Sequence, residues 1–108
     1  MTPIELIVDA EAGKALRCLY ETLTKFDIHE LTLNEQLKTI YFVRNAGIGI
    51  PVIHFFITVT PINHTQSQLR FYGEYKHSRY KNPHLAGNGE VIAFVSKVLD
   101  RFSKKLHA

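Results

Sequence analysis

The stretch that decides the fold is residues 52–60, which read Val52-Ile53-His54-Phe55-Phe56-Ile57-Thr58-Val59-Thr60. Successive side chains of a strand point to opposite faces of a sheet. One face of this stretch is fully apolar, because it consists of Ile53, Phe55, Ile57 and Val59. The stretch therefore predicts a β-strand with a core-facing side, and Pro61 is expected to end it.

Further strands are predicted on both sides of this stretch. Residues 68–76 alternate in the same way, with Arg70 and Tyr72 on a polar face that we expect to be wet. Residues 28–33 also alternate, a turn follows at 34–36, and residues 37–44 are rich in β-branched and aromatic side chains. The run 37–44 is apolar on both faces, which favours a strand that is covered on two sides, by the protein itself or by a partner. A short β-prone run at residues 4–8 completes the set.

Two amphipathic helices flank these strands. Apolar residues recur at helical spacing between 12 and 26, which predicts a helix over residues 10–25 with Asp9 as its N-cap. A second apolar stripe runs from 91 to 106, and we expect Asn88 to cap that helix after a long loop at 77–87. The order β-α-β-β-β-β-α predicts a single α+β domain over 1–108, with one antiparallel sheet of about five strands and two flanking helices.

Two resemblances add to this interpretation. The element order resembles helix-grip and TATA-binding-protein-like folds, in which a sheet wraps around a C-terminal helix. Ser78, Arg79, Leu85, Asn88 and Ile92 resemble a signature of an uncharacterised bacterial domain family, Ser-Arg followed by Asp-Leu-Gly-x-Asn-x-x-Arg-Ile. This chain has His84, Ala86 and Val91 where that signature has Asp, Gly and Arg. The second resemblance implies a fold more than a function.

Composition excludes several classes of protein. Of the 108 residues, 45% are hydrophobic and 21% are charged, which is typical of a globular chain and not of a disordered one. The longest apolar run is too short to cross a bilayer, and the first residues do not form a signal peptide, so we expect a cytoplasmic protein without membrane contact. The single cysteine, Cys18, is expected to be a buried helical thiol.

The sequence does not predict a catalytic or metal site. Six histidines are present, but none shows the H-E-x-x-H spacing, and Cys18 lacks a C-x-x-C partner. A G-x-S-x-G nucleophile elbow is also absent. We therefore expect a non-catalytic protein without a cofactor.

The basic segment 76–89 is the best candidate for ligand contact. It combines Lys76, Arg79, Tyr80 and Lys81 with the expected helix start at Asn88 and Gly89. Free N–H groups at a helix N-terminus attract anions, and an arginine can add bidentate contacts. The competing interpretation is a solvated basic loop that ends in a helix cap.

Three functional hypotheses follow. The leading one is a binding or assembly module, for an unknown partner or as a homodimer, with an apolar lip formed by Ile40, Phe42, Ile48 and Ile50. The second is a protein for a small hydrophobic or anionic ligand, with a cavity between the sheet and the C-terminal helix. In that hypothesis Ile48 and Ile50 lie at the mouth and Arg79 meets an acidic head group. The third is weak nucleic-acid binding through Arg70, Lys76, Arg79 and Lys81.

Overall fold

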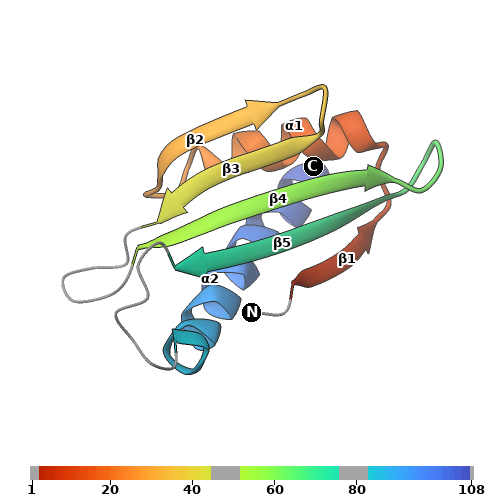
Figure 1. Ribbon diagram of the computed structural model, residues 1–108. Helices are drawn as coiled ribbons and strands as arrows, with labels where there is room; N and C mark the ends of the chain where they lie inside the picture. Colours follow the sequence, from red (N-terminus) through yellow and green to blue (C-terminus); the bar gives the residue numbers. More distant parts are fainter. Residues whose placement is uncertain (1–2, 45–51, 76–82, 108) are drawn as a thin grey trace.

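The computed structural model describes residues 3–44, 52–75 and 83–107 (Figure 1). The strands are β1 (Ile4–Val8), β2 (His29–Asn34), β3 (Thr39–Arg44), β4 (Ile53–Pro61) and β5 (Ser67–Tyr75). The helices are α1 (Ala12–Leu23) and α2 (Pro83–Leu106). The strands form one antiparallel sheet in the order β1-β5-β4-β3-β2. The predicted fold class and element order are confirmed.

The core lies on the face of β4 that the sequence predicts. Phe55 and Ile57 are 0% exposed, and Ile53 and Val59 are almost as deeply buried. Ile57 lies opposite Ile40 of β3 and Phe71 of β5, so the buried face continues across three strands. We call this side the inner face of the sheet and the opposite side the outer face.

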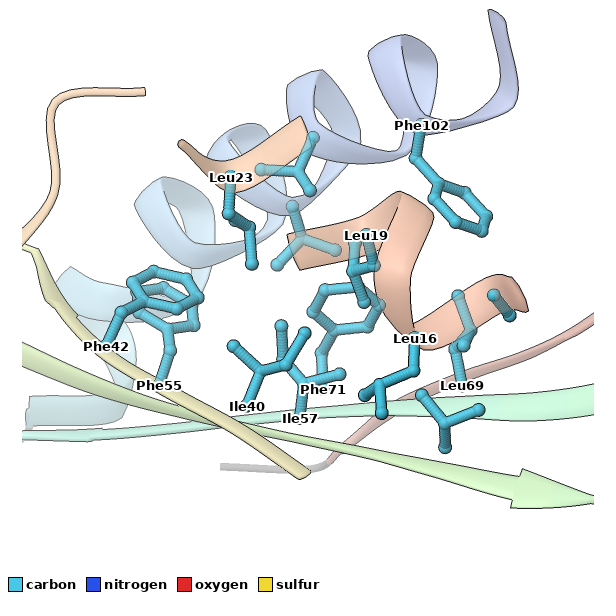
Figure 2. Packing of buried hydrophobic residues seen from close by; sticks show 14 of the residues in the cluster. Leu16, Leu19, Leu23, Ile40, Phe42, Phe55, Ile57, Leu69, Phe71 and Phe102 are labelled. Atoms are coloured by element: carbon cyan, nitrogen blue, oxygen red, sulfur yellow. The ribbon is translucent and has the colours of Figure 1, made fainter. Parts of the chain in front are cut away.

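Both helices pack against the inner face. Leu16, Leu19 and Leu23 of α1 point onto the sheet, and Phe102 of α2 lies beside them (Figure 2). The predicted apolar stripe of α2 is confirmed by the burial of Val91, Phe94, Val95, Val98 and Phe102. Within the described residues, both helices lie on one side of the sheet and leave the outer face without a covering layer (Figure 1).

The start of α1 differs from the prediction, because Glu11 and not Asp9 is its N-cap. The Glu11 carboxylate accepts hydrogen bonds from the backbone N–H groups of Gly13 at 2.7 Å and Lys14 at 3.2 Å. A Cβ at Gly13 would lie 3.0 Å from this carboxylate, so the glycine leaves room for the cap. The Asp9 side chain does not cap the helix and instead accepts a hydrogen bond from Gln66.

The start of α2 also differs, since the helix begins at Pro83 and includes Asn88. Proline suits the first turn of a helix, because its fixed φ is helical and its missing N–H would have no partner there. The predicted loop at 77–87 is therefore helical from Pro83 onward, and residues 77–82 lie outside the described part.

The run 37–44 differs in two respects. Leu37 belongs to the turn before β3 and is 70% exposed. Among the described elements, only the inner face of β3 is covered by helices, so the chain itself supplies no second covering layer there, and cover by a partner stays a prediction. Val43 is nevertheless 7% exposed on the outer face, where it lies opposite His29 and His54.

Candidate functional site

Much of the predicted site falls outside the described residues. This applies to the basic residues Lys76, Arg79 and Lys81, to Tyr80, and to Ile48 and Ile50 of the glycine-rich segment. The roles proposed for them stay predictions.

Ile40 and Phe42, the other members of the predicted apolar lip, are core residues. Each is 1% exposed, and both point from β3 toward the helices (Figure 2). Strand alternation directs these two side chains inward, whereas Tyr41 between them faces outward. The prediction of an exposed apolar surface is therefore wrong for Ile40 and Phe42.

The predicted anion site at Asn88 and Gly89 also needs correction. Free N–H groups occur in the first turn of a helix, and the first turn of α2 begins at Pro83. Asn88 is therefore not the N-cap, and Gly89 is an exposed residue within the helix.

Arg70 lies on the outer face of β5, as its alternation predicts. Its Nε is 3.5 Å from a carboxylate oxygen of Glu5 on β1, so part of its charge is compensated. Beside it, Tyr41, Phe56 and Tyr72 lie opposite one another on β3, β4 and β5. The ring centroid of Phe56 is 5.2 Å from that of Tyr41 and 6.4 Å from that of Tyr72. The outer face thus carries an aromatic row flanked by an ion pair.

Tyr41 and His54 form a polar pair at one side of this row. Burial raises the pKa of Tyr41, and the charge of Glu30 adds to this effect. The Tyr41 hydroxyl therefore stays protonated, and it shares a hydrogen bond with Nδ1 of His54, with 2.6 Å between the two atoms. Nε2 of His54 is buried without a hydrogen-bond partner among the described residues. This hydrogen bond orients the His54 ring on the outer face.

The core is filled at the end of the sheet where β3 stops and β4 starts. Phe42 stacks on Phe55 with ring centroids 4.9 Å apart, and Phe94 of α2 lies 5.4 Å from Phe55. The Arg44 guanidinium covers the Phe94 ring at 4.3 Å. These side chains fill the described part of this end, which is therefore packed core.

A pocket with both aliphatic and polar walls lies at the opposite margin, between β1 and the C-terminal half of α2. It has a volume of about 320 Å³. Its walls are formed by Leu6 and Val8 of β1 and by Leu99, Phe102 and Leu106 of α2. Except for Phe102, these core-facing side chains are only half-buried. The reason is that β1 is an edge strand among the described strands, so none of them covers these side chains (Figure 1).

Polar groups line the same pocket. Asp9 follows β1, and Ser103 of α2 lies one helical turn before His107, whose backbone N–H donates to the Ser103 carbonyl oxygen. Within the described residues, no hydrogen bond links these three side chains, so they do not form an assembled nucleophile and base. The Asp9 carboxylate accepts a hydrogen bond from Gln66 instead, at 3.1 Å. The pocket therefore combines aliphatic side chains with separate hydrogen-bonding groups.

A second, more polar groove runs between α1 and the end of α2. Its volume is about 610 Å³, and Lys105 crosses it to pair with Glu21 at 3.2 Å. Cys18 lies at its base, and burial raises the pKa of this thiol. The cysteine is thus buried in a helix as predicted, and its thiol is protonated at neutral pH. The groove therefore contains an ion pair and a protonated thiol. These two features do not define a functional site.

Two other properties follow from residues 3–44, 52–75 and 83–107. These residues contain no group of three or more His, Cys, Asp or Glu side chains arranged to hold a metal ion. Neither helix has a segment long and apolar enough to span a membrane.

The fold places the chain among helix-grip-like α+β proteins. Comparison with protein-family models and with curated proteins finds no match. Among solved structures, the chain is similar to the di-domain ARO/CYC StfQ from the steffimycin biosynthetic pathway, with a TM-score of 0.58 and 11% identity. The alignment covers 98% of this chain and 43% of StfQ, so the chain spans less than half of that protein. TTHA0849 from Thermus thermophilus aligns at 11% identity over 97% of this chain and 92% of that chain, with a TM-score of 0.40. The likeness to StfQ shows the fold alone.

The sequence predicts a ligand cavity between the sheet and the C-terminal helix, but at the end marked by Ile48, Ile50 and Arg79. It missed the pocket beside β1. The available signal was the alternation of Ile4, Leu6 and Val8, which marks an apolar face on a short strand. That signal becomes informative only when β1 is known to lie at the sheet edge, next to α2.

Proposed function

We propose that this protein binds a small, mainly apolar ligand in the pocket between β1 and α2. The observation that carries the proposal is the set of half-buried aliphatic side chains around the 320 Å³ cavity, with Asp9, Ser103 and His107 at its lining. Ligand sites are typically concave and apolar with a few polar groups that fix orientation. The fold supports the proposal, since StfQ belongs to a biosynthetic pathway and shares the arrangement of sheet and helices.

The size and lining of the pocket define the class of ligand. The volume lies at the lower end of the range of about 300–1,000 Å³ for ligand sites. It suits a short aliphatic chain or a single ring system. The hydroxyl of Ser103 and the imidazole of His107 offer hydrogen bonds to a polar head group.

Filling the pocket should abolish binding. In Leu99→Trp, the larger side chain occupies the cavity, and we expect at least a tenfold loss of affinity for apolar probes. The measurement is titration with anilinonaphthalene sulfonate and with alkanoic acids from hexanoic to dodecanoic acid. Native mass spectrometry of protein purified without ligand stripping identifies any molecule carried from the cell.

Ile92→Trp is the matched control, because Ile92 lies on the same helix and is 55% exposed. This variant should bind like the wild type, and both variants should keep a cooperative thermal transition. Equal binding by the Leu99→Trp and Ile92→Trp proteins, or no binding by the wild type, would refute the proposal.

A further inference from the structure

The free edge of β1 is the starting observation. β1 pairs with β5 along its whole length, from Ile4 opposite Phe71 to Val8 opposite Ser67. Among the described strands, none pairs with its other side. Every second residue of an edge strand directs its backbone N–H and C=O away from the sheet, which is a template for another strand.

The two edges of the sheet differ in their protection. β2 contains a register shift between His29 and Thr32, and Glu30 has a φ of 56°. Such irregularities block the addition of a strand. β1 shows neither feature, and Ile7 on its outer face is 61% exposed. Its one charged residue, Glu5, is occupied by Arg70 and by a hydrogen bond from Gln68.

The sequence of β1 is self-complementary in one antiparallel register. With a two-fold axis at Leu6, Ile4 lies opposite Val8 of the second copy, and Glu5 lies opposite Ile7. A two-fold axis at Glu5 would oppose two carboxylates, and an axis at Ile7 would place Glu5 opposite Asp9. Like charges directly opposite each other destabilise a strand pair. Registers that shift by one residue would place the apolar inner-face residues of one copy opposite the outer-face residues of the other copy.

We infer that two copies of this chain pair through β1, antiparallel and with Leu6 at the two-fold axis. The pairing joins the two sheets into one and satisfies the free backbone groups of both edges. It also covers Ile4, Leu6 and Val8, which a single copy leaves half-buried. The strand that pairs with this edge is β1 of a second copy, because that strand presents the same aliphatic side chains on the inner face. The inference does not depend on whether the pocket holds a ligand.

A charge test distinguishes this register from other modes of association. Ile7→Glu places a carboxylate opposite Glu5 of the second copy at two symmetric positions, so the protein should sediment as a monomer. Ile7→Lys places a cation opposite the same carboxylate, so it should stay a dimer like the wild type. Ile62→Glu is the matched control, since Ile62 is 49% exposed in the turn between β4 and β5, and it should also stay a dimer.

The measurement is sedimentation equilibrium over a concentration series, with circular dichroism as the check of folding. A dimeric mass for the wild type, Ile7→Lys and Ile62→Glu, with half that mass for Ile7→Glu, supports the inference. A monomeric wild type, a dimeric Ile7→Glu protein or a monomeric Ile7→Lys protein overturns it. Because sedimentation reports mass, this result is separate from the probe titrations that test ligand binding.

Discussion

Phe55 and Phe56 are consecutive residues of β4 with identical side chains and opposite surroundings. Phe55 is 0% exposed and stacks against Phe42, with Phe94 of α2 also in contact range. Phe56 is 40% exposed and lies beside the rings of Tyr41 and Tyr72 on the neighbouring strands. The comparison shows that position relative to the helices, and not residue type, decides whether an aromatic ring belongs to the core.

The same contrast holds for the two faces of the whole sheet. The inner face is aliphatic and aromatic, and both helices seal most of it. The outer face mixes aromatic rings with ionic and polar groups such as Arg70, Glu5 and Glu74. The inner face is incompletely covered along both edge strands, since Leu33 of β2 is half-buried as well, but the pocket occurs along β1. The buried contacts that stabilise the protein therefore lie mainly on the inner face. The proposed binding pocket lies at the margin where the helices cover that face incompletely.

The largest expected effect separates Phe55 from Phe56. Phe55→Ala removes a fully buried ring and should lower the free energy of unfolding by about 3–5 kcal/mol. Phe56→Ala removes cross-strand contacts on an exposed face and should cost roughly 1 kcal/mol or less. Urea denaturation of both variants measures the difference, and the slope of each transition should match that of the wild type. Equal losses would show that the outer face is covered in the native protein, and the contrast between the two phenylalanines would then not hold.

A smaller effect separates two hydroxyl groups. Ser67 is 0% exposed, and its hydroxyl donates to the carbonyl oxygen of Ala10 at 2.9 Å. Ser67→Ala leaves that acceptor without its partner and should cost about 1–2 kcal/mol. Tyr72 donates to Glu74 across 3.4 Å on the outer face, and Tyr72→Phe should change stability by about 0.5 kcal/mol or less. The same denaturation experiment applies, and a larger loss for Tyr72→Phe would assign a structural role to the outer face.

The two periodic patterns explain why most of the fold was predictable. Alternation in β4 and β5 and the helical stripes of α1 and α2 are local properties, and the structure buries the faces that they mark. The helix boundaries were less predictable. Asp9 is hydrogen-bonded to Gln66 in a turn that is distant in the sequence, and α2 starts at Pro83 and not at Asn88. The same limit applied to Ile40 and Phe42, whose apolar character indicates burial without indicating which layer buries them.

The candidate site was harder to predict than the fold. The pocket combines β1 with the C-terminal half of α2, which are at opposite ends of the chain. Its existence depends on the pairing of β1 with β5, and periodicity does not reveal which strand becomes an edge. Arg70 illustrates the same point, since the sequence shows its charge but not its partner Glu5 on β1.

The smallest expected effect concerns the helix cap that orients α1 over the inner face. Hydrogen bonds from the N–H groups of Gly13 and Lys14 lower the pKa of the Glu11 carboxyl below its usual value. A carboxyl with a lower pKa in the folded state stabilises the fold above its unfolded-state pKa, and this contribution is lost as the pH falls through the folded-state pKa. Glu11→Gln should therefore have a lower Tm than the wild type at neutral pH.

The pH dependence of that difference identifies its cause. The gap in Tm between the wild type and Glu11→Gln should narrow as the pH falls through the acid range, because protonation neutralises the wild-type carboxylate. Glu35→Gln is the matched control, since this exposed glutamate approaches Arg17 only at 3.8 Å and caps no helix. A gap that persists unchanged at low pH would mean that Glu11 acts through packing and not through its charge. In that case, the anchoring of α1 to the inner face would rest on its apolar stripe alone.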